Sequence, residues 1–173
     1  GTKALSAIGA FDSTSVCIGS IEDILTDCIY YFVRSSTRDF IAKYDVKADY
    51  ATFIAVDISK TPNLVDANGN PLTLDPFLKF TGKQITAINI IDNYLFWTDG
   101  DNEPKKIDLS KNYSGLQSNP QSDNHHSRLY LDGVNYGYLK EEHLTVIKKK
   151  PLRAPQIKVI SSKVFLLQQH HQE

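Results

Sequence analysis

The sequence predicts an all-β fold, and three observations lead to this prediction. Short apolar segments rich in β-branched and aromatic residues recur along the 173-residue chain, as is typical of strands. Clusters of Asp, Asn, Ser and Gly separate these segments and favour turns. Helical periodicity is weak throughout, and only residues 12–25 and 138–144 are compatible with a turn or two of helix.

The clearest pattern is a three-stranded meander in the middle of the chain. β-Branched residues form its first segment and aromatic residues its second, and glycine or Asx residues able to adopt positive φ separate the segments. The strands are expected at residues 85–91, 94–98 and 105–109, with turns at 92–93 and 99–102.

A second meander is predicted nearer the N-terminus. A short apolar strand is expected at residues 5–11, followed by four segments that form a four-stranded meander: 16–21, 28–33, 40–46 and 52–58. Residues 60–76, which contain Asn68-Gly69, are expected to form an inserted loop or hairpin.

The two meanders look like an internal repeat. Residues 29–32 correspond to 94–97 at an offset of 65, and residues 43–46 correspond to 106–109 at an offset of 63. In both units an apolar strand precedes the aromatic one. Two unrelated hairpins in an all-β sandwich are the alternative interpretation.

Residues 95–99, Leu-Phe-Trp-Thr-Asp, resemble the YWTD signature of β-propeller blades. In such blades the aromatic pair packs between sheets, and the Asp ends the strand at the turn. The resemblance implies a partial β-propeller of about two blades of antiparallel meanders, plus additional C-terminal strands. The residues expected to form the structural blade motif are Tyr94, Phe96, Trp97, Thr98, Asp99, Lys105 and Ile107.

The chain divides into four expected regions. Residues 1–111 form the propeller blades, 112–127 a long exposed polar loop, 128–157 further propeller strands, and 158–173 a C-terminal tail or the start of a following domain. In the third region a hairpin is expected around Asp132-Gly133, and residues 144–150 are expected to form another strand with a charged end. The absence of methionine predicts a fragment, a trimmed chain or a processed product.

Composition excludes a disordered chain and predicts a real hydrophobic core, since 41% of the residues are hydrophobic and 23% are charged. No run approaches the roughly 18 apolar residues of a membrane span, so no membrane-spanning segment is expected. The net charge of −1 hides an asymmetry. Residues 1–139 carry 12 basic and 17 acidic side chains, whereas residues 140–163 carry seven basic and two acidic ones.

The basic residues near the C-terminus are candidates for an assembly contact or for a contact with nucleic acid phosphates. These candidates are Lys148, Lys149, Lys150 and Arg153. A charged strand end that discourages edge pairing is the simpler interpretation, because the chain has no extended basic face.

Metal and disulfide chemistry have weak candidates. Asp99, Asp101 and Glu103 alternate as Ca²⁺ ligands do, but the EF-hand glycine and distal glutamate are absent, so a solvated turn is favoured. The pairs His125-His126 and His170-His171 have no partner at a fixed helical spacing. Cys17 and Cys28 form either a bridge between neighbouring strands or two ordinary half-buried thiols.

No catalytic constellation is visible in the sequence. The chain has no nucleophile elbow, no phosphate-binding glycine loop and no zinc-protease helix. Its acids and serines occur where turns are expected. We therefore expect a protein that is not an enzyme and that has no cofactor, no catalytic residues and no metal site.

Several segments together resemble the tail structural proteins of short-tailed, crAss-like phages, notably their nozzle or muzzle proteins. The similar segments are residues 6–12, 16–21, 88–92, 95–99, 102–108 and 141–155. The Trp-Thr-Asp element followed directly by Glu-Pro-Lys-Lys and later by Thr-Val-Ile-Lys-Lys is the more specific part of this pattern. The resemblance covers roughly residues 1–157.

This resemblance implies a virion component of the phage tail, located in the nozzle or muzzle region of the DNA conduit. In that family the propeller is discontinuous and belongs to a longer chain. The expected partners are other tail subunits or domains, with homo-oligomers inside a larger assembly and transient passage of DNA. The alternative is a β-propeller recognition module that binds a protein or glycan, as in receptor ectodomains.

Overall fold

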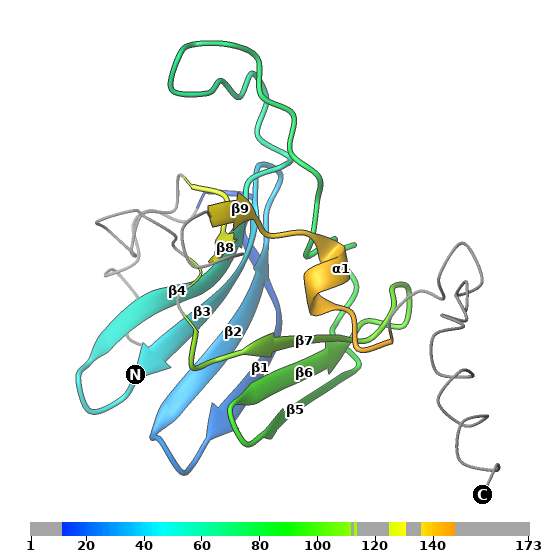
Figure 1. The fold of residues 1–173 in the computed structure, drawn as a ribbon. Helices are drawn as coiled ribbons and strands as arrows, with labels where there is room; N and C mark the ends of the chain where they lie inside the picture. The colour runs from blue at the N-terminus through cyan, green and yellow to red at the C-terminus, as the bar shows by residue number, and fades with distance from the viewer. Residues whose placement is uncertain (1–11, 112, 114–124, 131–135, 148–173) are drawn as a thin grey trace, which may run out of the picture.

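The computed structural model describes residues 12–111, 113, 125–130 and 136–147, and over these residues the fold is all-β (Figure 1). The described strands are β1 (Val16–Asp23), β2 (Cys28–Arg34), β3 (Asp39–Asp45), β4 (Tyr50–Asp57), β5 (Ala87–Ile91), β6 (Tyr94–Thr98), β7 (Lys105–Asp108), β8 (Arg128–Tyr130) and β9 (Tyr136–Tyr138). One short helix, α1 (Glu141–Leu144), is described as well. No helix among these residues has the length and apolar character needed to cross a bilayer.

The first four strands form one antiparallel sheet in the order β1-β2-β3-β4. Asp27 and Asp49 adopt positive φ in the turns after β1 and β3, a conformation that short Asx side chains tolerate. The four-stranded meander predicted from the sequence is therefore confirmed. The strand predicted at residues 5–11 lies outside the described residues.

The predicted three-stranded meander is also confirmed, in the order β5-β6-β7. Asp92 has a φ of 54° in the turn between β5 and β6, and Gly100 has a φ of 77° in the turn after β6. In the β5–β6 register, Ile88 pairs with Trp97. The local turn chemistry read from the sequence therefore sets the order and register of these strands.

The two sheets pack against each other around the main hydrophobic core. Its largest members are aromatic and aliphatic residues from both sheets and from the segment between them: Ile18, Tyr30, Phe32, Ile41, Phe77, Leu78, Phe80, Leu95, Trp97 and Ile107. At the corner where the sheets meet, the Ile85 amide donates to the Ile18 carbonyl over 2.8 Å. A Cβ on Gly19 would lie 3.0 Å from Ile85 Cβ, so glycine permits this close approach.

A second core lies on the opposite face of the β1–β4 sheet. It contains Val33, Phe40 and Val56 from the sheet and Ile58 and Leu74 from the excursion between β4 and β5. This excursion projects at the top of Figure 1. It narrows to a hairpin in which Leu72 N donates to Leu64 O over 2.8 Å, which confirms the predicted insertion.

The region after β9 differs from the prediction. β8 and β9 pair antiparallel as expected, and α1 is the turn of helix that the sequence allowed within residues 138–144. Leu144 therefore belongs to this helix and not to a strand. The Lys140 amide donates to His143 Nδ1 over 3.1 Å, which caps the first turn of the helix. Thr145 forms only an isolated bridge with Lys105, and residues 148–150 lie outside the described residues. The predicted strand at 144–150 is therefore wrong at its start.

The expectation of an exposed loop over residues 112–127 is also wrong where it can be compared. Tyr113, His125, His126 and Ser127 are all buried. Ser127 extends the edge of β4, because its amide donates to the Val56 carbonyl and its hydroxyl accepts from the Val56 amide, each over 2.8 Å. These polar side chains are therefore buried in the interior and not exposed on a loop.

Candidate functional site

The predicted blade motif forms one continuous structural unit on β6, β7 and the turn between them. Trp97 and Ile107 are buried in the main core, and Trp97 is 4% exposed. Phe96 and Thr98 are half-buried, whereas Tyr94 is exposed at the start of β6. The motif is therefore a packing element whose alternate side chains point into and out of the core.

Asp99 ends β6 and organises the next turn. Its carboxylate accepts from the amides of Asp101 and Asn102 and from the Asn102 side chain, over 2.8 to 3.0 Å. Burial raises the pKa of Asp99, but these hydrogen bonds and the nearby Lys105 cation outweigh burial and lower it. Asp101 instead binds Lys83 over 2.7 Å. In the described part of the chain no group of three or more metal-ligating side chains occurs.

Lys105 is a buried cation, with its side chain only 1% exposed. Its Nζ lies 3.3 Å from Glu141 Oε1, and the other oxygen of Glu141 binds Lys79. Glu141 is the first residue of α1, so the ion pairs attach this helix to β7 and to the segment before β5. The predicted motif residue Lys105 thus has a structural partner, Glu141, that was not predicted from the sequence.

Two buried carboxylates, Asp39 and Asp57, lie opposite each other at the ends of β3 and β4. Asp57 accepts from the amides of Phe77 and Leu78 over 2.7 and 3.0 Å, and Asp39 accepts from the Phe80 amide over 3.2 Å. The pair therefore fixes residues 77–80 across the edge of the sheet. This pair was not predicted from the sequence, although a carboxylate at each strand end was the available signal.

Each carboxylate of this pair faces a basic side chain. Lys60 Nζ lies 2.5 Å from Asp39, and His126 Nδ1 lies 3.7 Å from Asp57. Burial raises the pKa of Asp39 to about 6 despite the opposing effect of Lys60. Burial lowers the pKa of His126, and the nearby Asp57 opposes that shift. The ring of His126 also packs edge-on against Phe77, so its surroundings are those of a core histidine.

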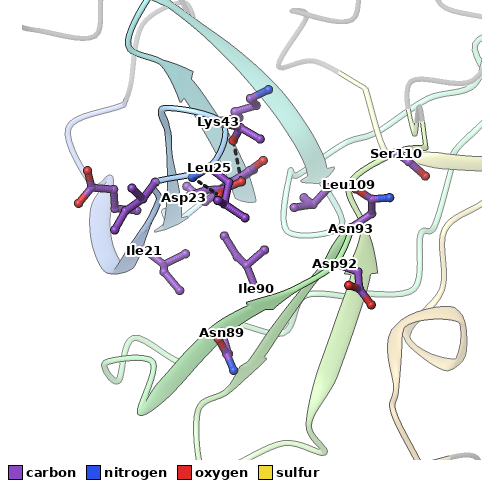
Figure 2. A pocket seen from close by; sticks show the side chains of 14 residues that line it. Ile21, Asp23, Leu25, Lys43, Asn89, Ile90, Asp92, Asn93, Leu109 and Ser110 are labelled. Atoms are coloured by element: carbon purple, nitrogen blue, oxygen red, sulfur yellow. Dashed lines mark hydrogen bonds between the residues drawn. The ribbon is translucent and has the colours of Figure 1, made fainter.

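Among the surface grooves of the described structure, two lie beside loops that connect the strands. The first groove, of about 700 Å³, lies between the β1–β2 turn and the β5–β6 turn, and Figure 2 shows the side chains around it. The second groove, of about 480 Å³, lies between the β4–β5 excursion and the segment carrying His126, Arg128 and Tyr138. The Arg128 guanidinium stacks over the Tyr138 ring with 4.9 Å between its carbon and the centroid.

The remaining candidates divide into those the structure describes and those it does not. Cys17 and Cys28 are free thiols at opposite ends of the β1–β2 ladder, where they pair with Val33 and Asp23 respectively. Lys148, Lys149, Lys150, Arg153, His170 and His171 lie outside the described residues.

Comparison of the chain with protein-family models, with curated proteins and with solved structures finds no match.

Proposed function

We propose that the protein is a non-enzymatic structural component of a phage tail, in the nozzle or muzzle region of the DNA conduit, and that it works by assembly with neighbouring β domains or subunits. The observation that carries the proposal is the packing of two antiparallel meanders face to face across Phe32 and Trp97. Adjacent blades of a propeller pack in this way. The segments that resemble tail proteins support the proposal that this assembly is a phage tail.

Open strand edges support a role in assembly. β5 is the outer strand of its sheet among the described strands, and Ile91 at its end is 52% exposed. An unpaired edge can accept a further strand, and the burial of exposed aliphatic side chains then stabilises the contact. At about 25 cal/mol per Å², roughly 800 Å² of apolar contact is worth about 20 kcal/mol before entropic costs.

The polar sites described above support a structural role as well. Asp39, Asp57 and Asp99 use their oxygens on backbone amides and neighbouring side chains, and Lys105 is paired with Glu141. These groups hold loops in place. The absence of a cofactor and of catalysis remains part of the proposal, as does a homo-oligomeric state.

The direct test is the composition of the virion. Mass spectrometry of particles produced from the genome that encodes the chain should recover it in fixed stoichiometry with the portal and other tail proteins. Complete, infectious particles without the chain would contradict the proposal.

A second test concerns the β5 edge. In sedimentation velocity, the Ile91→Lys variant should associate more weakly than the wild type, because a charge on an edge strand opposes strand addition. Val46→Lys is the matched control, since Val46 is 50% exposed and lies in the turn between β3 and β4. Equal association of wild type, variant and control would exclude this edge from the assembly.

A recognition module for a protein or glycan is the second candidate function, and the second groove favours it. Apolar side chains of Leu64, Leu72 and Leu74 line this groove beside Arg128 and Tyr138. Apolar surface with a few polar groups is usual for binding sites. Saturable binding in a glycan array that is lost in Arg128→Ala, together with virions that lack the chain, would favour this candidate.

A further inference from the structure

The first groove combines an apolar lining with exposed aliphatic side chains at its rim. Ile21, Tyr30, Ile90 and Leu109 contribute apolar surface from both sheets. At the rim, Ile24 is 78% exposed and Leu25 is 96% exposed. Figure 2 shows Ile21, Ile90, Leu25 and Leu109 around the groove. Apolar surface gathered in this way indicates a contact with another polypeptide.

The turn that presents these side chains is held in place by hydrogen bonds. The Asp23 carboxylate accepts from the Leu25 amide over 3.1 Å and from the Thr26 hydroxyl over 2.6 Å. A fixed turn that keeps two aliphatic side chains in solvent is ready for binding, because little further ordering is required.

The charge of the groove specifies what kind of segment fits it. Three carboxylates, Glu22, Asp23 and Asp92, line it together with one ammonium group, that of Lys43. The lining therefore carries a net charge of about −2 at neutral pH. Its occupant should combine cationic and apolar side chains.

This chain contains such a segment at residues 148–153, Lys-Lys-Lys-Pro-Leu-Arg. It has four cations and a leucine within six residues. We propose that this basic segment of one copy binds the first groove of a second copy. The inference rests on the proposed function, since it describes how copies associate.

The position of the groove favours a second copy over the same chain. The Val146 amide donates to the Pro104 carbonyl, at the start of β7, whereas Leu109 and Ser110 line the groove beyond the end of β7. A four-residue strand spans about 13 Å, and Lys148 follows Val146 by two residues, or about 7 Å of extended chain. The backbone of Lys148 therefore falls short of the groove of its own copy, whereas a second copy can present the whole segment to that groove.

Charge exchange in the full chain tests the proposal. The groove variant is Glu22→Lys with Asp92→Asn, because asparagine tolerates the φ of 54° at position 92. The segment variant is Lys148→Glu with Lys149→Glu and Lys150→Glu. By sedimentation velocity in low salt, each variant alone should associate at least about tenfold more weakly than the wild type. A 1:1 mixture of the two should recover association, and so should one chain that carries all five changes.

The control is Glu103→Lys, since Glu103 is an exposed acid that does not line the groove. It should associate like the wild type. Raising the salt concentration should weaken association of the wild type and slightly strengthen that of the two variants, because salt screens attraction in the first case and like-charge repulsion in the second.

The outcomes separate this inference from the proposed function. If both variants associate as strongly as the wild type, the groove contact is excluded while assembly through strand edges stands. If the wild type remains monomeric at every concentration, both proposals fail. If the segment variant loses affinity for a DNA duplex while its self-association stays at the wild-type level, the basic segment serves nucleic acid and the groove inference is wrong.

Discussion

The ring of Phe32 on β2 meets the ring of Trp97 on β6 edge to face, with 5.5 Å between the centroids and 60° between the planes. Phe32 is completely buried and Trp97 nearly so. Each residue comes from the aromatic strand of its own meander. The contact therefore joins the two sheets through the strands that correspond in the repeat predicted from the sequence.

Removing the Trp97 side chain should destabilise the protein more than any change on the exposed face of the same strand. Trp97→Ala is expected to lower the free energy of unfolding by about 3 to 5 kcal/mol, because it leaves a large cavity between the sheets. Tyr94→Ala is the control on β6, since Tyr94 is 38% exposed. Urea unfolding followed by circular dichroism measures both. Equal losses for the two variants would contradict the packing described.

Local sequence signals predicted most of the fold. Asp92-Asn93 and Gly100 terminate strands by their own backbone preferences, so the β5–β7 meander could be derived from neighbouring residues alone. The turn of helix at α1 lies within residues 138–144, where the sequence allowed one, but its packing could not be predicted because its partners are distant residues. Glu141 binds Lys79 and Lys105, and Leu144 is buried in the main core.

The candidate site was less predictable than the fold, for a related reason. The polar composition of residues 112–127 predicts an exposed loop. His126 is nevertheless buried beside Asp57, a residue that lies 69 positions earlier in the sequence. The pairing of Asp39 with Asp57 likewise depends on sheet register and not on spacing. Single-sequence patterns identify which strands form, whereas buried polar partners emerge only from the tertiary arrangement.

Asp57 should contribute far more to stability than an exposed aspartate with similar hydrogen bonds. Asp57→Ala leaves the buried amides of Phe77 and Leu78 without an acceptor, and each such group costs about 1 to 3 kcal/mol. Asp66 accepts from the amides of Asn68 and Asn70 on the surface, where water replaces a lost acceptor. Asp66→Ala should therefore cost less than about 1 kcal/mol. Thermal unfolding of the two variants gives the comparison.

The pKa of Asp39 predicts a specific pH dependence. Its value of about 6 in the folded state lies above the 3.8 of an unperturbed aspartate, so the native state binds an extra proton between these two pH values. The contribution is fully present below about pH 4 and is lost as the pH rises through 6. The loss is on the order of 3 kcal/mol from pH 4 to pH 7.

Comparison with Asp39→Asn isolates this contribution from the other carboxylates. The free energy of unfolding of the wild type minus that of the variant should fall steadily from pH 4 to pH 7, because only the wild type titrates at this position. Urea unfolding at half-unit pH intervals measures the difference. A difference that stays constant or rises over this range would show that the Asp39 pKa is not raised.

The ion pair between Glu141 and Lys105 predicts that removing one partner destabilises the protein and that replacing both partners restores most of the stability. Glu141→Gln leaves the Lys105 ammonium buried without its carboxylate, and breaking a buried pair costs about 3 to 5 kcal/mol. Glu103→Gln is the control, since Glu103 is an exposed acid two residues before Lys105.

Replacing both partners, as in Lys105→Met with Glu141→Gln, should recover most of the lost stability, because methionine fills the space without a charge to desolvate. Urea unfolding of the single and double variants completes the cycle. A double variant as unstable as Glu141→Gln alone would mean that Glu141 acts through Lys79 and not through Lys105.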